Sequence, residues 1–326
     1  MILVTGAAGF IGSVLVKSLN DQGITNIILV DRLKDTSKWL NLRGLLFDEY
    51  IHADELFDAH NSRLFAGLKG IYHLGACSDT TEKNMDYLMK NNLEFSKKLF
   101  LFASQNQVPM VYASSAATYG DGEKGYSDDP ESIKNFRPLN GYGYSKQLFD
   151  EWVLKQKRFP PAWYGMKFFN VYGPNEYHKG KMRSVVVQAH EQILSTGAVK
   201  LFKSYVAGYD DGEQKRDFIY VKDVVNAMLQ LMKHGKDSGI YNMGTGVART
   251  FKDLVNATFT AHGKSPKIEF IEMPDHLKKQ YQYYTQAEMT KFKNTLPDFK
   301  FHSLEEGVLD YVQNYLAKDN PYIVQS

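Results

Sequence analysis

Short, continuously apolar runs alternate with longer segments of helical periodicity along the first half of the chain. Apolar runs of this length predict buried strands, and apolar positions that recur with a 3.6-residue period predict helices. Strands separated by helices in this way are typical of a parallel sheet with helices on both faces. The predicted strands are 2–4, 27–30, a weaker one near 50–51, 71–74, 110–113 and 164–169, and the predicted helices are 10–21, 87–106 and 142–157.

The second half is less regular. Residues 171–183 are rich in Gly, Pro and Lys and predict a loop, and residues 203–217 predict a polar, glycine-containing connection. The pattern as a whole predicts an α/β fold, in which a doubly wound parallel sheet is followed by a smaller α/β C-terminal lobe. The predicted elements here are strands at 199–202, 218–220 and 240–242, and helices at 184–196, 223–234, 250–261 and 304–316.

Composition narrows the classes of function. The 326 residues are 43% hydrophobic and 23% charged, which fits a globular chain with a full core. Thirty-nine Lys and Arg against 37 Asp and Glu leave a net charge of +2, which argues against a nucleic-acid partner. The single cysteine, Cys77, and the absence of a visible signal peptide favour the cytoplasm. We also expect no membrane segment and no metal site, since no long apolar run and no histidine ligand pattern occurs.

A glycine-rich turn follows the first predicted strand and opens the first predicted helix. Gly6, Gly9 and Gly12 form the pattern G-x-x-G-x-x-G. The first glycine permits a tight turn, the second lets the backbone approach a pyrophosphate, and the third lets helix and strand pack closely. The start of the helix offers amide groups and a partial positive charge to phosphate. The turn therefore predicts a dinucleotide site.

Residues after the second strand bear on the choice of cofactor. Asp31 lies about 20 residues beyond the turn, where an acidic residue meets the adenosine ribose and favours NAD. Arg32 follows at once and Lys38 lies a few residues on, and two cations there favour the 2′-phosphate of NADP. These residues alone leave both cofactors open.

The glycine turn makes the predicted sheet one of Rossmann type. We assign residues 1–170 to the cofactor-binding domain, with returning segments near 218–245. Residues 171–326 then form mainly the substrate-binding lobe, and the active site is expected between the two.

Tyr142 and Lys146 form the spacing Y-x-x-x-K at the start of a predicted helix and so share one helical face. An ammonium near a phenol favours the phenolate, and a base that works near neutrality needs a phenol pKa about 3 units below its usual value. Ser114 and Ser115 end a strand at the edge of the sheet where ligands bind in such folds. Tyr144, two residues from Lys146, is expected to face elsewhere.

With these features the chain resembles the extended short-chain dehydrogenase/reductase family, which includes sugar-nucleotide epimerases and dehydratases. Residues 114–120, 216–224 and 240–246 support the resemblance over nearly the whole length. The 4,6-dehydratases of the family typically carry an Asp-Glu pair where this chain has Ala116 and Ala117, so the acid that expels water is missing.

A closer resemblance is to the branch that epimerises ADP-heptoses at C6″. The segments that carry it are 75–78, 113–120, 169–174, 178–180, and 281–282 with 285–286. It implies conversion of ADP-D-glycero-β-D-manno-heptose to its L-glycero epimer for lipopolysaccharide core, through transient oxidation to a ketone and re-reduction with tightly bound NADP.

The same resemblance implies roles for particular residues. Tyr142 and Lys179 are the two acid/base groups, assisted by Lys146 and Ser115. The implied cofactor contacts are Gly6, Gly9, Phe10, Ile11, Gly12, Asp31, Arg32, Lys38, Leu74, Gly75, Ala76, Cys77, Ser78, Asn91, Lys146, Val171 and Lys179. The implied substrate contacts are Asn170, Lys181, Gln188, Phe202, Lys203, Ser204, Tyr205, Arg216 and Tyr281. A homo-oligomer, such as a pentamer, is also implied.

The chain departs from this branch at several positions. Leu74 stands where Glu is frequent, Lys181 where a small Ser is usual, and Gln188 where His is usual, and the loop 205–214 is longer. Two alternatives on the same scaffold are a UDP-sugar 4-epimerase and a net sugar-nucleotide reductase. An alternative of another class is a non-catalytic NAD(P)-binding sensor, although such proteins typically lose the tyrosine or the lysine that this chain keeps.

Overall fold

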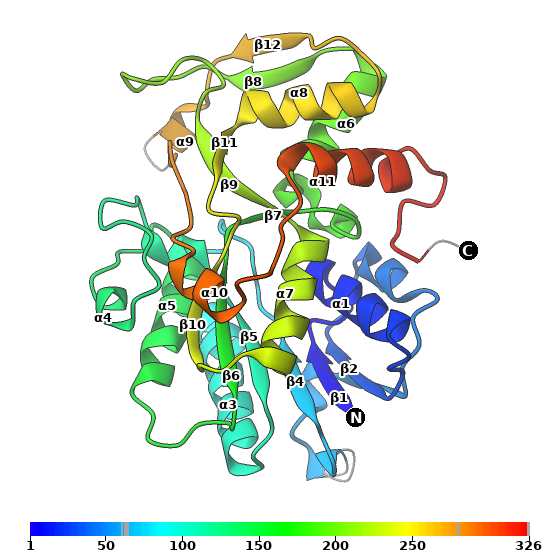
Figure 1. Cartoon of the computed structure of the whole chain (residues 1–326), viewed down its shortest axis with the longest axis vertical. Helices are drawn as coiled ribbons and strands as arrows, with labels where there is room; N and C mark the ends of the chain where they lie inside the picture. Colours follow the sequence, from blue (N-terminus) through cyan, green and yellow to red (C-terminus); the bar gives the residue numbers. More distant parts are fainter. Residues whose placement is uncertain (60, 62–64, 279–280, 325–326) are drawn as a thin grey trace.

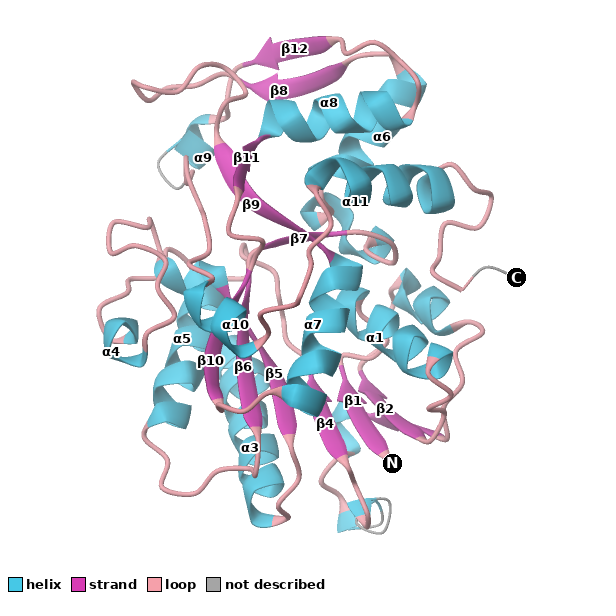
Figure 2. Ribbon diagram, in the orientation of Figure 1, coloured by secondary structure: helices cyan, strands magenta, loops and turns pink. Residues whose placement is uncertain are grey.

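The structure is a computed structural model that describes residues 1–59, 61, 65–278 and 281–324. Within these residues, seven parallel strands form one sheet in the order β10-β6-β5-β4-β1-β2-β3 (Figures 1 and 2). The chain order reverses at β1, between β2 and β4, and such a switch point is where ligands bind in open α/β sheets. The strands are β1 Ile2–Thr5, β2 Ile27–Asp31, β3 Glu49–His52, β4 Gly70–His73, β5 Met110–Ser115, β6 Trp163–Phe168 and β10 Gly239–Met243.

Helices cover both faces of this sheet, which explains why its inner strands are buried along their length rather than on alternate residues. Every residue of β2 and of β5 is buried. Helices α1 (Phe10–Asp21) and α7 (Val221–His234) lie together on one face, and α3 (Phe95–Gln105) and α5 (Gly141–Leu154) lie on the other (Figure 2). The predicted α/β class and Rossmann-type sheet are confirmed.

A second layer of structure lies beyond the carboxyl ends of the large sheet (Figure 1). A three-stranded sheet in the order β11-β9-β7 lies next to it, and a two-stranded parallel sheet of β12 and β8 lies at the far end. The elements of this part are β7 Asn170–Tyr172, β8 Val199–Phe202, β9 Lys215–Tyr220, β11 Ala248–Thr250, β12 Ile268–Ile271, α6 Val185–Ser195, α8 Phe251–Ala261, α11 Leu304–Tyr311 and the π-helical Val312–Leu316.

Several elements differ from those predicted. The single helix expected at 87–106 is interrupted by π-helical turns at Met89–Glu94, which turn Asn91 and Asn92 into the interior. The loop expected at 171–183 contains the end of β7 and the 3₁₀ helix Tyr177–Met182, and β9 begins at Lys215 inside the expected polar connection. Of the expected returning segment, β10 joins the large sheet, whereas β9 pairs with β7 and β11.

The remaining short elements lack the length that a periodic pattern needs to be recognised. They are α2 Met85–Leu88, α4 Pro130–Ile133, α9 Asp275–Lys278, α10 Thr290–Thr295, and the 3₁₀ helices Ser37–Leu42, Ala53–Glu55 and Ala116–Tyr119. Among the helices described, none is both long and apolar enough to cross a bilayer.

Candidate active site

The glycine turn lies at the switch point of the sheet. The Gly6 amide donates to the Val30 carbonyl at 2.8 Å, and Gly6 has a left-handed φ of 68°. A Cβ on Gly6 would lie 2.6 Å from the backbone nitrogen of Gly75, and one on Gly12 would overlap the Gly6 carbonyl oxygen. Helix α1 begins at Phe10, and its N-cap residue Gly9 has no side chain to cap it, so the first amides of the helix are available to an anion. The turn therefore has the shape and polarity that a dinucleotide pyrophosphate requires.

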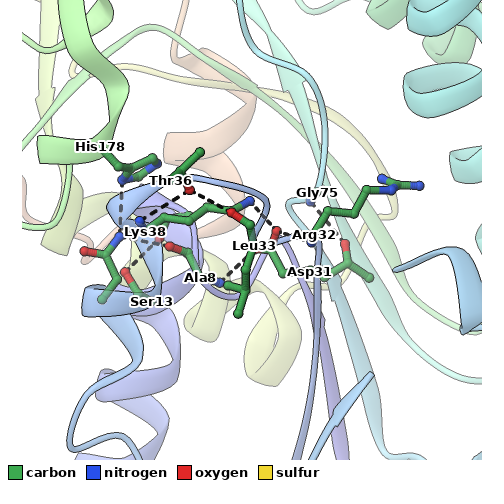
Figure 3. A network of polar contacts seen from close by, with 12 residues as sticks. Ala8, Ser13, Asp31, Arg32, Leu33, Thr36, Lys38, Gly75 and His178 are labelled. Atoms are coloured by element: carbon green, nitrogen blue, oxygen red, sulfur yellow. Dashed lines mark hydrogen bonds and ion pairs between the residues drawn. The ribbon is translucent and has the colours of Figure 1, made fainter. Parts of the chain in front are cut away.

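Asp31 ties the end of β2 to this turn. Its buried carboxylate accepts the Ala8 amide at 2.9 Å and the Lys38 ammonium at 2.6 Å. Arg32 extends in another direction, as Figure 3 shows. Its guanidinium donates to the Asp54 carboxylate at 2.6 Å and to the Asn91 side-chain oxygen at 2.6 Å. The cations Lys38 and Arg32 and the backbone amide of Ala8 thus border the position expected for the ribose.

The segment after β4 lies beside the turn. The Gly75 amide donates to the Thr5 hydroxyl at 3.1 Å, and the Leu74 amide donates to the Thr5 carbonyl at 3.1 Å. Buried Asn92 accepts from the Cys77 amide at 2.8 Å and donates to the Ser145 hydroxyl at 3.0 Å. Asn92 therefore joins the predicted cofactor segment 74–78 to helix α5, beside Lys146.

Tyr142, Ser115 and Lys146 meet at the carboxyl end of β5. Ser115 forms a hydrogen bond with the Tyr142 phenol, which lowers the phenol pKa, but burial raises it more. The Lys146 ammonium donates to the Ala113 carbonyl at 2.8 Å, and burial lowers the pKa of Lys146 to about 8. The expectation of a lowered phenol pKa is wrong in this structure, because burial penalises the phenolate. Tyr144 is 46% exposed and faces away, as expected.

A buried ion pair between Asp150 and Lys167 lies next to this cluster. Asp150 lies one helical turn after Lys146, and its carboxylate accepts the Lys167 ammonium at 2.7 Å and the Ser114 hydroxyl at 2.6 Å. Both members of the pair are fully buried. The Thr118 hydroxyl accepts from Lys167 at 2.8 Å and donates to the Ser115 carbonyl at 2.8 Å. The pair therefore reaches the backbone of Ser115.

Lys179 lies near the glycine turn on a segment from the C-terminal half. Its ammonium lies 5.5 Å from the centre of the Phe10 ring, and its amide donates to the Glu176 carbonyl at 3.0 Å. Burial lowers the pKa of Lys179, and the negative charge of Glu176 opposes that shift. The structure thus places a partly desolvated amine beside the first helical residue of the cofactor turn.

Three of the predicted substrate residues gather beside β9. Arg216 is 7% exposed and lies between two rings, 5.2 Å from the centre of Tyr281 and 5.6 Å from that of Phe251. The Phe202 and Tyr281 rings lie 6.4 Å apart. Burial lowers the pKa of Arg216, and the charges that oppose that shift come from tyrosines. A buried guanidinium held between rings is suited to an anionic ligand.

The other predicted substrate residues occupy more varied positions. Lys181 is exposed, Asn170 is exposed at the start of β7, and Gln188 donates to the Arg183 carbonyl at 3.0 Å. Lys203 pairs with Glu272 at 2.8 Å, and the Tyr205 hydroxyl also contacts Glu272. The structure therefore does not bring this set together with Arg216 by direct contacts.

Sequence reasoning missed several buried polar residues that support the site. Lys167 interrupts an otherwise apolar strand, and a polar residue in such a place is the signal that could have found it, whereas Asn92 lies in a largely polar helical segment that offers no such signal. Asn41 lies in a short 3₁₀ helix and Asn175 and Glu176 lie at a turn, where sequence periodicity offers no such signal. In the part of the chain that the structure describes, no cluster of three or more His, Cys, Asp or Glu residues could hold a metal ion.

Comparison with known proteins agrees with this geometry. The family model for the NAD dependent epimerase/dehydratase family matches residues 2–244. A protein of Fusobacterium nucleatum subsp. nucleatum named ADP-L-glycero-D-manno-heptose-6-epimerase is 49% identical over 99% of this chain and 100% of its own length.

Solved structures of epimerases share the fold of this chain over nearly its whole length. The crystal structure of the Helicobacter pylori protein of that name is 32% identical with a TM-score of 0.82, covering 97% of this chain and 96% of its own. A UDP-glucose 4-epimerase from Thermotoga maritima is 27% identical with a TM-score of 0.74, covering 94% of this chain and 96% of its own. The chain therefore belongs to the NAD dependent epimerase/dehydratase family, in the branch of the relatives named ADP-L-glycero-D-manno-heptose-6-epimerase.

Proposed function

We propose that the protein is an isomerase that converts ADP-D-glycero-β-D-manno-heptose to ADP-L-glycero-β-D-manno-heptose by inversion at C6″. The observation that carries the proposal is the identity of 43–49% over the full chain to relatives with that name. The cluster of Ser115, Tyr142 and Lys146 supports an active enzyme rather than a sensor, because a sensor has no use for these groups. The product would supply the lipopolysaccharide core.

The chemistry explains why a redox cofactor is needed. The C–H bond at C6″ has no neighbouring carbonyl, so direct proton abstraction is not available. NADP, when bound, supplies reversible hydride transfer, and the substrate passes through a ketone that is reduced on its other face. The Tyr142 phenol, hydrogen-bonded to Ser115, is proposed to exchange the hydroxyl proton in one orientation of the sugar terminus. The Lys179 amine is proposed to do so in the other.

The cofactor is proposed to be NADP, with NAD as the alternative within this NAD dependent family. The glycine turn and the uncapped start of α1 would hold the pyrophosphate. Lys38 and Arg32 would bind the 2′-phosphate. To do so they would release their present partners, Asp31, Asp54 and Asn91. Residues 74–78 and Val171 would complete the site.

The substrate is proposed to lie between the carboxyl edge of the large sheet, in domain 1–170, and the lobe 171–326. Arg216 would bind its pyrophosphate, and the Tyr281 and Phe202 rings would pack against its nucleoside. Asn170, Lys181, Gln188 and residues 203–205 would contribute further contacts. The protein is proposed to work in the cytoplasm as a homo-oligomer.

The test is to incubate the purified protein with NADP and ADP-D-glycero-β-D-manno-heptose and to follow C6″ by NMR. Inversion is expected with no net change in the redox state of the cofactor, whereas a net reductase supplied with NADPH would release oxidised cofactor in proportion to product. Tyr142→Phe and Lys179→Met should each lower the rate by about 10²–10⁴-fold, whereas Tyr144→Phe should leave it unchanged. Turnover of a UDP-hexose without inversion of the heptose would assign the chain to the 4-epimerases instead.

A further inference from the structure

The segment that carries Lys179 has an unusual backbone where it leaves β7. Asn175 has a φ of 75°, in the left-handed region, and its side chain is fully buried. Asparagine tolerates this region better than other residues with a Cβ, although glycine adopts it at no steric cost. A buried asparagine at such a position is explained by what its amide contacts.

Asn175 contacts three separate parts of the chain. Its side-chain nitrogen donates to the Ser13 hydroxyl in α1 at 2.9 Å, and its carbonyl accepts from the side chain of Asn41 at 3.1 Å. Its side-chain oxygen accepts from the Ile323 amide at 2.9 Å. Since Asn41 also donates to the Ala8 carbonyl at 2.9 Å, Asn175 is joined to both the glycine turn and the helix that follows it.

The C-terminal segment packs against the residues that follow Asn175. The Tyr177 hydroxyl donates to the Pro321 carbonyl at 2.7 Å, and the Tyr177 and Tyr322 rings meet edge to face at 5.3 Å. The His178 ring lies 3.3 Å from the Asn41 side-chain nitrogen and on the same side of Ala8 as Ser13 (Figure 3). His178 therefore lies beside Asn41, which contacts the cofactor turn, and Tyr177 is held by the C-terminal segment.

Glu176 fixes the same segment to the C-terminal lobe. Its buried carboxylate accepts from the Ser184 hydroxyl at 2.6 Å, from the Gly173 amide at 3.3 Å and from the Tyr311 hydroxyl in α11 at 3.2 Å. The consecutive residues Asn175 and Glu176 thus attach the Lys179 segment to two different layers of the molecule. Asn175 makes the attachment on the cofactor side.

We propose that Asn175 is a positioning residue for Lys179, because its side-chain amide ties the segment 175–179 to Ser13 in α1, the helix that follows the glycine turn, and so sets the place of the Lys179 amine beside the cofactor. The proposal rests on the acid/base role proposed above for Lys179. A residue that served only the stability of the fold would affect all parts of the site equally. A positioning residue acts selectively through Lys179.

The first test measures the placement of the segment and is independent of any activity. Asn175→Gly removes the amide while suiting the left-handed backbone, and Asn106→Gly, at an exposed helix end, is the matched control. Brief trypsin digestion of the folded protein should cleave Asn175→Gly after Lys179, Lys181 or Arg183 about tenfold faster than the wild type, because two hydrogen bonds are lost. The rate of cleavage at other sites, and at all sites in the Asn106→Gly control, should equal that of the wild type. Equal cleavage of wild type and Asn175→Gly would overturn the proposal.

The second test measures whether Asn175 acts through Lys179. Asn175→Gly should lower kcat for heptose inversion by up to about 10²-fold while KM changes much less, since misplacement of an acid/base group affects the reacting step. In a Lys179→Met background the same substitution should cost less than twofold. An undiminished loss in that background would refute the role. If Asn175→Gly does not fold, Ser13→Ala, which removes the partner hydroxyl and so one of the two hydrogen bonds, replaces it in both tests, with smaller changes expected in the same directions.

If the wild type inverts no ADP-heptose, the proposed function fails while the trypsin test still decides where the segment is held. If the wild type is active and either variant test is negative, the positioning role fails alone.

Discussion

Replacing Lys167 with Met removes one member of the buried ion pair under the Tyr142 and Lys146 helix. In the structure the Lys167 ammonium lies 2.7 Å from the Asp150 carboxylate, and neither side chain is exposed. Methionine fills a similar volume, so the packing loss is small. The main consequence is a buried carboxylate without its cation.

The magnitude follows from that burial. Removing one partner of a buried pair typically costs about 3–5 kcal/mol of the free energy of unfolding. Asp150 keeps the hydroxyl donors Ser114 at 2.6 Å and Tyr112 at 3.3 Å, so the lower end, about 3 kcal/mol, is expected. Replacing both members, Lys167→Met with Asp150→Leu, removes both charges of the pair and should restore most of that loss.

Urea unfolding followed by circular dichroism measures these differences. The control is Lys134→Met, which removes an exposed ion pair with Glu131 and should cost less than about 1 kcal/mol. The reasoning is refuted if Lys167→Met is within about 1 kcal/mol of the wild type, or if the double variant is as unstable as the single one. Asp150→Asn adds a second check: since the negative charge of Asp150 raises the pKa of Lys146, its removal should lower that pKa below about 8.

Three further predictions concern the site itself. Gly12→Ala places a Cβ against the Gly6 carbonyl oxygen, so the turn must move and NADPH affinity, measured by fluorescence titration, should fall at least about tenfold. Unchanged affinity would contradict the assignment of the glycine turn as the pyrophosphate site. Arg216→Lys keeps the charge but loses the flat contact with Tyr281, so KM for ADP-heptose should rise about tenfold with little change in kcat, and an equal KM would show that Arg216 does not bind substrate. Burial lowers the pKa of Lys146 to about 8, so on raising the pH the folded state loses this proton before the unfolded state does. Between pH 8 and 10.5 the free energy of unfolding of the wild type should therefore rise relative to that of Lys146→Met, by about 3 kcal/mol in total. A difference between the two proteins that does not change with pH would disprove the shift.

The sequence by itself determined the features that depend on near neighbours in the chain. Continuous apolar runs located the inner strands, and the glycine spacing located the turn at the switch point. The spacing of Tyr142 and Lys146 placed both on one helix next to Ser115. Such patterns are local, because strand and helix periods are set by residues two to four positions apart.

Tertiary structure alone decided the contacts between distant segments. Asn175 meets Ser13 across a sequence separation of 162 residues, and no local pattern distinguishes that asparagine from one in a solvated loop. The pKa of Tyr142 moves opposite to the expectation because its direction depends on burial, which the Y-x-x-x-K spacing does not report. Burial and long-range hydrogen bonds arise only when the layers pack together, so the chemical character of these groups belongs to the assembled fold.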